Sequence, residues 1–279
     1  MHSEQGGSLF GGWDELAIVV VVADVDGTLL GPGHLVDDAA KAAVKAAHER
    51  GAVFTIATGR IFHSARAVAL EAGIGAPIIA GGGAVLGYPE GGVIRRLNIG
   101  REMALEILCR TGRGVARYAF VNDRIYTDTP GPHVATYSSA LGVPVQVVGD
   151  LTAVVNDETT HVVLRLPPSE ADDVVGRFSG ELRGVARVMR TLPHLVEFVH
   201  PLVSKGRAIE YLCTHLGVPL SGVLAVGDGL SDTDMLAVAG VGVAVANAPL
   251  EVRRRSRHVT RESYAAGVLE AIREFVGAG

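Results

Sequence analysis

The chain has 279 residues, of which 48% are hydrophobic and 20% are charged, and its formal net charge is -5. This is the composition of a folded globular protein that is long enough for one large core or for two domains. The mildly acidic balance offers no electrostatic footprint for a phosphate backbone, so we expect no nucleic-acid partner.

The two cysteines, Cys109 and Cys213, do not form a CxxC pair and do not suggest a disulfide framework. This usage is typical of a reducing compartment, so we expect a cytoplasmic protein. The apolar run before Asp24 is far shorter than the roughly 20 residues that span a bilayer. It also lacks the cationic flank of a signal peptide, and we therefore expect no membrane partner.

Strand and helix patterns alternate in the first part of the chain. The continuous β-branched run at Val19–Ala23 is typical of a strand that is covered on both faces. The Ala-rich segment Asp37–Arg50 predicts a helix, and Val53–Ala57 predicts the next strand. A helix over about 64–72 and a strand at 77–80 follow. This β-α-β-α-β order predicts a parallel α/β sheet.

The pattern changes between about residues 87 and 201. Short β-rich segments dominate this part, and two helical segments, 102–110 and 169–178, lie among them. After Ser204 the alternation of helix and strand returns. We therefore predict an α/β core made of residues 1–83 and 200–279, into which an α+β domain, residues 84–199, is inserted.

Polar residues follow three of the predicted core strands. They are Asp24 and Asp26 after the first strand, Thr58 and Gly59 after the second, and Asp228 after the third. In open parallel sheets, ligands bind outside the carboxyl ends of the strands. If these strands are neighbours, the polar residues meet in one crevice, and Lys205 joins them if its helix points inward.

Carboxylates that lie this close together repel one another unless a cation sits among them. Mg²⁺ is the natural choice, because it takes oxygen ligands from one or two carboxylates together with phosphate oxygens. Lys205, Thr58 and the backbone amides around Gly27 and Gly59 can then face an anion. A carboxylate nucleophile in this setting fits phosphoryl transfer through an aspartyl-phosphate.

Each of these features has an ordinary structural explanation when it is taken alone. A DxD pair can form an Asx turn, a TGR tripeptide is more often only a turn, and a lysine is usually solvated. The sequence GDGLSDTD can be a glycine-rich acidic loop. The ordered combination, with each piece at a strand end or a helix start, favours a functional site.

Four motifs in this order, DVDGTLL, TGR, SKG and GDGLSDTDML, resemble those of the haloacid dehalogenase-like phosphatases. The large insert after GGGAV and the ANAPLEV sequence near the end resemble the Cof-type branch of that family. The resemblance covers nearly the whole chain after about Ala17. It implies a Rossmann-like parallel-sheet core and a mobile α/β cap that closes over the site.

The resemblance also implies roles for the matching acidic residues. Asp24 would be the nucleophile, and Asp26 would protonate the leaving oxygen and later activate water. Mg²⁺ would be held by Asp24, by the backbone carbonyl of Asp26 and by Asp228. Asp232 would support the metal site without contacting the ion. A neighbouring anionic centre raises the pKa of a carboxyl group, which agrees with an acid/base role for Asp26.

The chain matches the family pattern at most phosphate-binding positions and departs from it at two positions. Thr58, Gly59 and Lys205 match it, and they are expected to bind the phosphoryl oxygens. Ser231 stands where relatives usually have Asn, and we expect it to bind phosphate on a shorter arm. Gly82 also replaces the usual Asn, which removes an amide near the hinge of the expected cap.

We therefore predict a Mg²⁺-dependent phosphatase that hydrolyses small phosphate monoesters, in particular sugar or polyol phosphates. The alternatives are a phosphotransferase such as a phosphomutase on the same fold, and a non-catalytic protein that binds phosphorylated ligands. A metal-dependent glycosyltransferase explains the DxD pair but leaves Lys205 and the GDGLSD sequence without a role. The partner is expected to be a small phosphorylated metabolite, and the sequence specifies neither its identity nor the oligomeric state.

Overall fold

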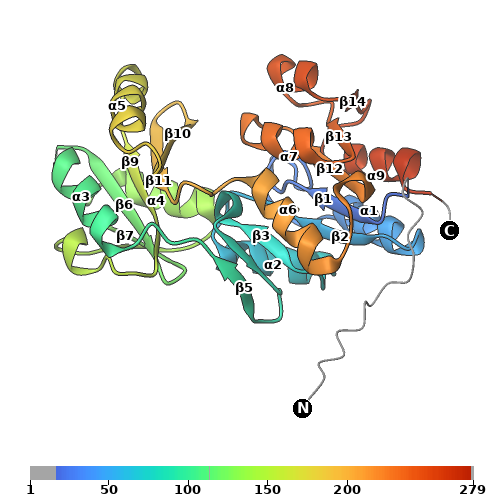
Figure 1. Cartoon of the computed structure of the whole chain (residues 1–279), viewed down its shortest axis with the longest axis horizontal. Helices are drawn as coiled ribbons and strands as arrows, with labels where there is room; N and C mark the ends of the chain where they lie inside the picture. The colour runs from blue at the N-terminus through green and yellow to red at the C-terminus, as the bar shows by residue number, and fades with distance from the viewer. Residues whose placement is uncertain (1–16, 113, 278–279) are drawn as a thin grey trace, which may run out of the picture. The chain divides into compact units, whose positions relative to one another are not determined.

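The computed structural model describes residues 17–112 and 114–277. The contacts among its residues divide the chain into two units (Figure 1). The first unit contains residues 17–57, 71–77 and 205–277, and the second contains residues 58–70 and the described part of 78–204.

These units differ from the predicted domains at their margins. Residues 58–70, 78–83 and 200–204 group with the second unit, although the sequence pattern assigns them to the core. The division into a catalytic core and an inserted cap stays a prediction about how the chain works.

A five-stranded sheet forms the centre of the first unit, in the order β14-β13-β12-β1-β2, and all its pairs are parallel. Its strands are β1 (Val20–Ala23), β2 (Val53–Ile56), β12 (Val223–Gly227), β13 (Val241–Ala244) and β14 (His258–Val259). Every residue of β1 and β12 is buried, as expected of apolar strands that are covered on both faces. Figure 1 shows β1, in blue, beside β12, in orange, so segments from opposite ends of the chain meet here.

The register of this sheet determines which residues meet at its carboxyl edge. Ala23 at the end of β1 pairs with Val226 of β12 and with Ile56 of β2. Asp24 and Asp228 therefore leave the same edge of the sheet, as the sequence predicts.

Five α-helices lie entirely within the described part of the first unit. They are α1 (Asp38–Glu49), α6 (Lys205–Leu216), α7 (Thr233–Val238), α8 (Leu250–Arg255) and α9 (Tyr264–Phe275). Asp37 caps α1, because its Oδ1 accepts a hydrogen bond of 2.8 Å from the backbone N–H of Ala40. Helix α1 buries its alanine-rich face and packs against α9, and α6 packs against α7.

The second unit contains a six-stranded sheet in the order β10-β11-β9-β6-β7-β8. Its strands are β6 (Ala116–Val121), β7 (Arg124–Thr127), β8 (Val145–Val147), β9 (Thr159–Arg165), β10 (Arg187–Leu192) and β11 (Leu195–Val199). All pairs are antiparallel except β7 with β8. This sheet agrees with the expected α+β character of the insert.

Side chains alternate between two apolar clusters on the two faces of this sheet. One face packs on α3 (Arg101–Thr111) and α5 (Pro168–Glu181), where Phe178 meets Phe198 edge to face. The other face carries a smaller cluster that includes Tyr118 and Tyr137, the latter from α4 (Pro132–Leu141). The sequence predicted α3 and α5 but not α4.

The strand expected at 77–80 does not join the parallel sheet. It forms β3 (Ile78–Ala80), which pairs antiparallel with β4 (Val85–Gly87), and β5 (Val93–Arg96) completes a three-stranded sheet. The antiparallel pairing of β3 with β4 follows from the turn at Gly81–Gly83, whose φ angles of 57°, 62° and 105° return the chain on itself. Only glycine adopts such a run of positive φ angles readily.

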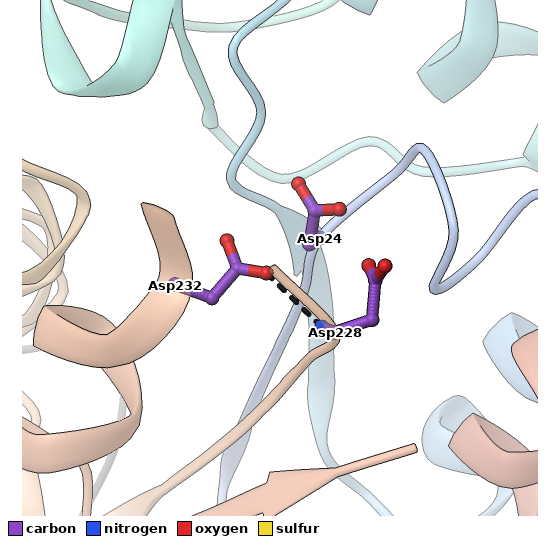
Figure 2. A group of neighbouring side chains, drawn as sticks. All are labelled: Asp24, Asp228 and Asp232. Atoms are coloured by element: carbon purple, nitrogen blue, oxygen red, sulfur yellow. Dashed lines mark hydrogen bonds between the residues drawn. The ribbon is translucent and has the colours of Figure 1, made fainter. Parts of the chain in front are cut away.

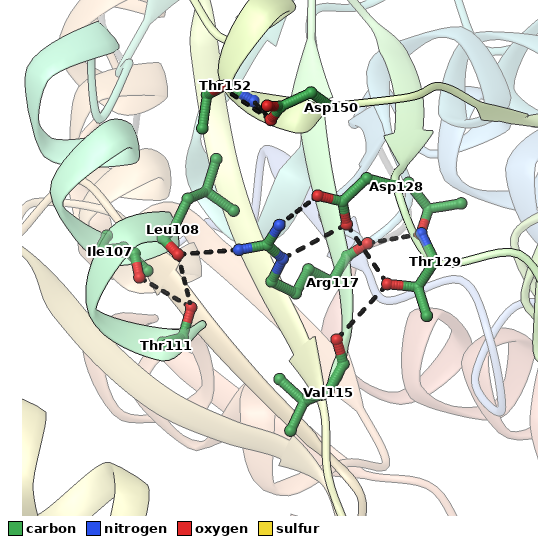
Figure 3. Close-up of polar contacts among 10 residues, drawn as sticks. Ile107, Leu108, Thr111, Val115, Arg117, Asp128, Thr129, Asp150 and Thr152 are labelled. Carbon is green, nitrogen blue, oxygen red and sulfur yellow. Dashed lines mark hydrogen bonds and ion pairs between the residues drawn. The ribbon is translucent and has the colours of Figure 1, made fainter. Parts of the chain in front are cut away.

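A buried ion pair joins β6 to the end of β7 in the second unit, and its arginine also contacts α3 (Figure 3). The Arg117 and Asp128 side chains are each 3% exposed, and they form a two-point contact through Nε and Nη2. Arg117 Nη1 also donates to the backbone carbonyl of Leu108, 2.8 Å away. The charges of this pair are thus compensated inside the protein, as a buried guanidinium requires.

Candidate active site

Asp24 is the first residue after β1, and the sheet fixes its position. Its backbone N–H donates to the carbonyl oxygen of Val226, 2.9 Å away, which continues the β1–β12 ladder by one step. The side chain is buried, and its Oδ1 accepts a hydrogen bond of 2.5 Å from Lys205 Nζ. A carboxylate in this position needs such a partner, because burial without one is costly.

The turn after Asp24 depends on a glycine. Gly27 has a φ of 92°, and its backbone N–H donates to the carbonyl oxygen of Leu30 at 2.9 Å. A Cβ atom at Gly27 would lie 2.4 Å from Asp228 Oδ2. The glycine therefore allows both the left-handed turn and the close approach of the Asp228 carboxylate.

Lys205 is the first residue of α6, and its ammonium lies between two carboxylates. Nζ is 2.5 Å from Asp24 Oδ1 and 2.6 Å from Asp232 Oδ1, and the lysine side chain is 4% exposed. Gly206 allows α6 to approach α7, since a Cβ there would lie 2.9 Å from the carbonyl oxygen of Asp234. The lysine is thus held inside the site, and the alternative of a solvated lysine does not apply.

Asp232 is held from both sides. Its Oδ2 accepts the backbone N–H groups of Asp228, at 3.0 Å, and of Gly229, at 2.8 Å, while Oδ1 faces Lys205. These contacts shape the loop that carries Asp228, and the role of Asp232 as a support that does not contact the ion stays a prediction.

Three carboxylates converge at this edge of the sheet (Figure 2). Asp24, Asp228 and Asp232 each offer an oxygen, and these atoms lie within 4.8 Å of one another. Thr28 Oγ1 donates to Asp228 Oδ1 at 2.7 Å and orients that carboxylate. A set of hard oxygen donors at this spacing could hold a divalent cation.

The electrostatics of the site also favour a cation. Burial and the neighbouring carboxylate of Asp232 raise the pKa of Asp24 to about 8, although Lys205 opposes the shift. Burial also raises the pKa of Asp228. Burial alone lowers the pKa of Lys205, but Asp232 and Asp24 outweigh it, so the net shift is upward and the ammonium stays charged. One ammonium thus leaves the carboxylate charge only partly neutralised.

Asp26 lies at the rim of this cluster. Its side chain is 36% exposed, and its Oδ1 lies 2.8 Å from Nδ1 of His34. In the described part of the chain, the cluster of converging carboxylate oxygens does not include the Asp26 side chain. Metal binding through the backbone carbonyl of Asp26, and proton transfer by its carboxyl group, stay predictions.

The remaining predicted residues lie in two places. Ser231 belongs to the short 3-10 turn Leu230–Asp232, and its Oγ lies 3.5 Å from Asp232 Oδ1. Thr58 and Gly59 belong to the second unit. Thr58 is buried, its N–H donates to the carbonyl oxygen of Ile79, and its Oγ1 accepts the N–H of Arg60. Gly59 is exposed. Phosphate binding by these three residues stays a prediction.

The sequence reading missed three residues that support the site. Thr28 orients Asp228, and His34 orients Asp26. Asn247 Nδ2 donates to the carbonyl oxygen of Gly27 at 2.8 Å. Asn247 Oδ1 in turn accepts the backbone N–H of Tyr264, which starts α9. Thr28 and Asn247 lie inside the DVDGTLL and ANAPLEV sequences, but their contacts depend on the folded turn.

A parallel sheet that presents carboxylates and a buried lysine at its carboxyl edge defines a hydrolase of the class expected from the four motifs. The chain belongs to the haloacid dehalogenase-like hydrolase family, whose model matches residues 21–272. The expected family, fold and enzyme class are confirmed by this match and by the similar proteins that follow.

Two solved structures and one curated relative illustrate the similarity. One structure is that of BT1666 from Bacteroides thetaiotaomicron, which is described among the phosphatases of the haloalkanoate (HAD) enzyme superfamily. It is 26% identical to this chain with a TM-score of 0.79, and the match covers 96% of this chain and 99% of BT1666. The structure of TM0651 from Thermotoga maritima is also 26% identical with a TM-score of 0.79. The match covers 92% of this chain and 97% of TM0651. The HMP-PP phosphatase of Cronobacter sakazakii is 26% identical over 81% of this chain and 83% of its own.

The described helices do not meet the requirements of a membrane span. None of them combines the length and the apolar character that a membrane crossing needs.

Proposed function

We propose that this chain is a Mg²⁺-dependent phosphatase that hydrolyses small phosphate monoesters through an aspartyl-phosphate intermediate. The observation that carries the proposal is the buried contact of Lys205 with Asp24 and Asp232, beside the carboxylate of Asp228. This arrangement combines a nucleophile, a fixed positive charge and oxygen ligands for a cation, which phosphoryl transfer requires.

In the first step, a carboxylate oxygen of Asp24 attacks phosphorus, and the bond from phosphorus to the leaving oxygen breaks. Asp26 donates a proton to that oxygen, so the leaving group departs as an alcohol. In the second step, Asp26 accepts a proton from water, and the water oxygen attacks the phosphorus of the aspartyl-phosphate. Orthophosphate leaves and the Asp24 carboxylate is restored.

Each supporting residue has a definite task in this scheme. Lys205 holds Asp24 in place and offers positive charge to the phosphoryl oxygens. The backbone N–H groups of Asp228 and Gly229 fix Asp232, which in turn holds Lys205. Asp24, Asp228 and the carbonyl group of Asp26 would hold Mg²⁺, which would supply further positive charge opposite the transferring group.

The substrate class and the location belong to the same proposal. We assign the role of substrate selection to the predicted insert, residues 84–199, and the phosphoryl contacts to Thr58, Gly59 and Ser231. The Thr58 hydroxyl oxygen accepts the N–H of Arg60, which leaves its proton to donate to a phosphoryl oxygen. A sugar or polyol phosphate is the proposed substrate, in a reducing, cytoplasmic setting.

A phosphate-release screen over a panel of phosphorylated metabolites with Mg²⁺ tests this function. Release from sugar or polyol phosphates by the wild-type enzyme, and none by Asp24→Asn, is the expected result. A transferred phosphoryl group without free phosphate would identify a phosphotransferase instead. Tight binding of a phosphorylated metabolite without turnover would identify a binding protein.

A further inference from the structure

The loop Thr58–Ile61 is held on one side by the segment that contains β3 and the glycine turn. Thr58 N–H donates to the carbonyl oxygen of Ile79 at 2.9 Å, and Gly82 N–H donates to the carbonyl oxygen of Thr58 at 2.9 Å. Gly81 N–H donates to the carbonyl oxygen of Arg60 at 2.7 Å. These bonds fix the beginning of the loop, and the end of the loop runs directly into α2 (Phe62–Ala72).

The residue before α2 cannot cap the helix. An N-cap side chain must accept a hydrogen bond from the first free N–H groups, and Ile61 has no acceptor. The acceptor comes from the β6–β7 hairpin, since the carboxylate of Asp123 accepts the backbone N–H groups of Phe62 and His63. Both the hairpin and this end of α2 belong to the second unit.

The hairpin turn is built to present this carboxylate. Asn122 and Asp123 connect β6 to β7, and Val121 pairs with Arg124 on either side of them. Their φ angles are 50° and 60°, as in the two-residue turns that match the twist of a hairpin. Asn and Asp are the non-glycine residues that tolerate this conformation best. Asp123 is half-buried at the helix end, whereas Asn122 is exposed.

We propose that Asp123 is a positioning residue, which orders the loop Thr58–Ile61 by capping α2. The inference rests on the proposed function, in which Thr58 and Gly59 bind the phosphoryl group. Without the carboxylate, the first turn of α2 frays and the loop adopts several conformations. Only a fraction of the molecules then presents Thr58 correctly, and the apparent dissociation constant rises by the inverse of that fraction.

Three variants test this assignment. Asp123→Gly removes the carboxylate but keeps the turn, because glycine adopts positive φ freely. Asn122→Gly makes the matched change at the neighbouring position, and Asp123→Asn keeps an acceptor that caps helices about as well as Asp. We expect Asp123→Gly to raise KM about five- to tenfold with kcat unchanged within about twofold. Asn122→Gly and Asp123→Asn should stay within about twofold of the wild type in both constants.

A second readout does not depend on turnover. Amide hydrogen exchange at Phe62 and His63 should accelerate in Asp123→Gly and stay unchanged in Asn122→Gly, because only the first variant frees these N–H groups. A KM for Asp123→Gly equal to that of Asn122→Gly, or a fall in kcat alone, would show a merely structural cap and overturn the proposal.

A wild-type enzyme without phosphatase activity would overturn the proposed function instead. In that event, unaltered exchange at Phe62 and His63 would also overturn the ordering role of Asp123.

Discussion

Lys205 Nζ lies 2.5 Å from Asp24 Oδ1, and this contact joins the first residue of α6 to the first residue after β1. Both side chains are almost fully buried, so the pair can exist only because further groups compensate its charges. Asp232 provides that compensation on the lysine side, and two backbone N–H groups provide it for Asp232. Positive charge is thus fixed beside the expected nucleophile before any substrate arrives.

Replacing Lys205 by methionine should therefore reduce both activity and stability. Lys205→Met keeps most of the volume but leaves Asp24 and Asp232 facing each other, and loss of one partner of a buried pair costs about 3–5 kcal/mol. We expect kcat/KM to fall by at least about a hundredfold, because the fixed charge opposite the phosphoryl group is lost. Steady-state kinetics and thermal unfolding measure the two effects.

The exposed Lys45 provides the matched control, since its side chain is 76% exposed. Lys45→Met should leave both quantities unchanged. A Lys205→Met enzyme with activity within about fivefold of the wild type would show that the lysine only balances charge in the fold.

Asp24→Asn should abolish turnover and stabilise the metal-free protein. The amide cannot attack phosphorus, but it can still accept the hydrogen bond from Lys205. It also removes a carboxylate whose pKa is raised by burial and by the neighbouring carboxylate of Asp232. Phosphate release and the melting temperature in excess chelator are the measurements, with the exposed Asp173→Asn as a control of equal charge change. Phosphate release at the wild-type rate by a folded Asp24→Asn protein would rule out the covalent mechanism.

The positions of Asp24 and Asp228 were predictable from the sequence, and that of Lys205 only on the condition that its helix points inward. Apolar strands that end in acids must present them at one edge of a parallel sheet, and the register of Ala23 with Val226 then brings them together. The resemblance to a known family supplied the order of the motifs and the role of Lys205. These are properties of short segments and of strand order, which a sequence records directly.

Other features depend on contacts that arise only after folding. The capping of α2 by Asp123 requires the hairpin turn to stand at the helix end, and no spacing in the sequence indicates this. Helix α4 was missed because His133, two Ser residues and the β-branched Val134 and Thr136 weaken its helical pattern. The antiparallel pairing of β3 follows from the positive φ angles at Gly81–Gly83, which strand propensity does not report.

Removal of Mg²⁺ should abolish activity, and its return should restore it. A cation that binds only the folded protein also stabilises it, by about 2.7 kcal/mol at a concentration one hundred times the dissociation constant. We expect Mg²⁺ to raise the melting temperature of the wild type and of Asp26→Asn, but not of Asp228→Asn. The reason is that the Asp26 side chain lies outside the converging carboxylates, whereas that of Asp228 belongs to them.

This experiment separates the two roles of Asp26. Asp26→Asn should retain the thermal shift while losing turnover, because it keeps the backbone carbonyl but not the acid. Loss of the thermal shift in Asp26→Asn would instead make its carboxylate a metal ligand. Full wild-type activity after verified metal removal would contradict the dependence on Mg²⁺.

Stability at acid pH should depend on His161, which is buried in the second unit beside Gly81. Burial lowers its pKa from 6.5 to about 4, although a hydrogen bond with the Gly81 backbone opposes the shift. Between these two values the unfolded chain binds a proton that the folded chain does not. The contribution of His161 to the free energy of unfolding is therefore fully present above about pH 6.5. It is lost as the pH falls toward 4, and the loss is about 3 kcal/mol at most.

His161→Gln removes this titration, so its free energy of unfolding should vary less between pH 7.5 and pH 4.5 than that of the wild type. Denaturant unfolding at the two pH values measures the difference. The exposed His48→Gln should retain the wild-type pH dependence. If the free energy of unfolding of His161→Gln fell as much as that of the wild type between pH 7.5 and pH 4.5, groups other than His161 would be responsible.

Ser231 should contribute to catalysis but not be essential. Its hydroxyl lies 3.5 Å from Asp232 Oδ1, a distance that leaves it loosely held and able to turn toward a phosphoryl oxygen. Loss of a hydrogen bond to a charged group costs roughly 1.5–3 kcal/mol, about tenfold to a hundredfold or slightly more in rate. We expect Ser231→Ala to lower kcat/KM within that range, and Lys205→Met to lower it further because the ammonium carries formal charge. Ser231→Asn should keep or raise activity, since the longer amide offers an N–H donor. Steady-state kinetics on the folded variants decide the matter: if Ser231→Ala equals the wild type, Ser231 is only a spacer in the loop, and the phosphoryl group is bound without it.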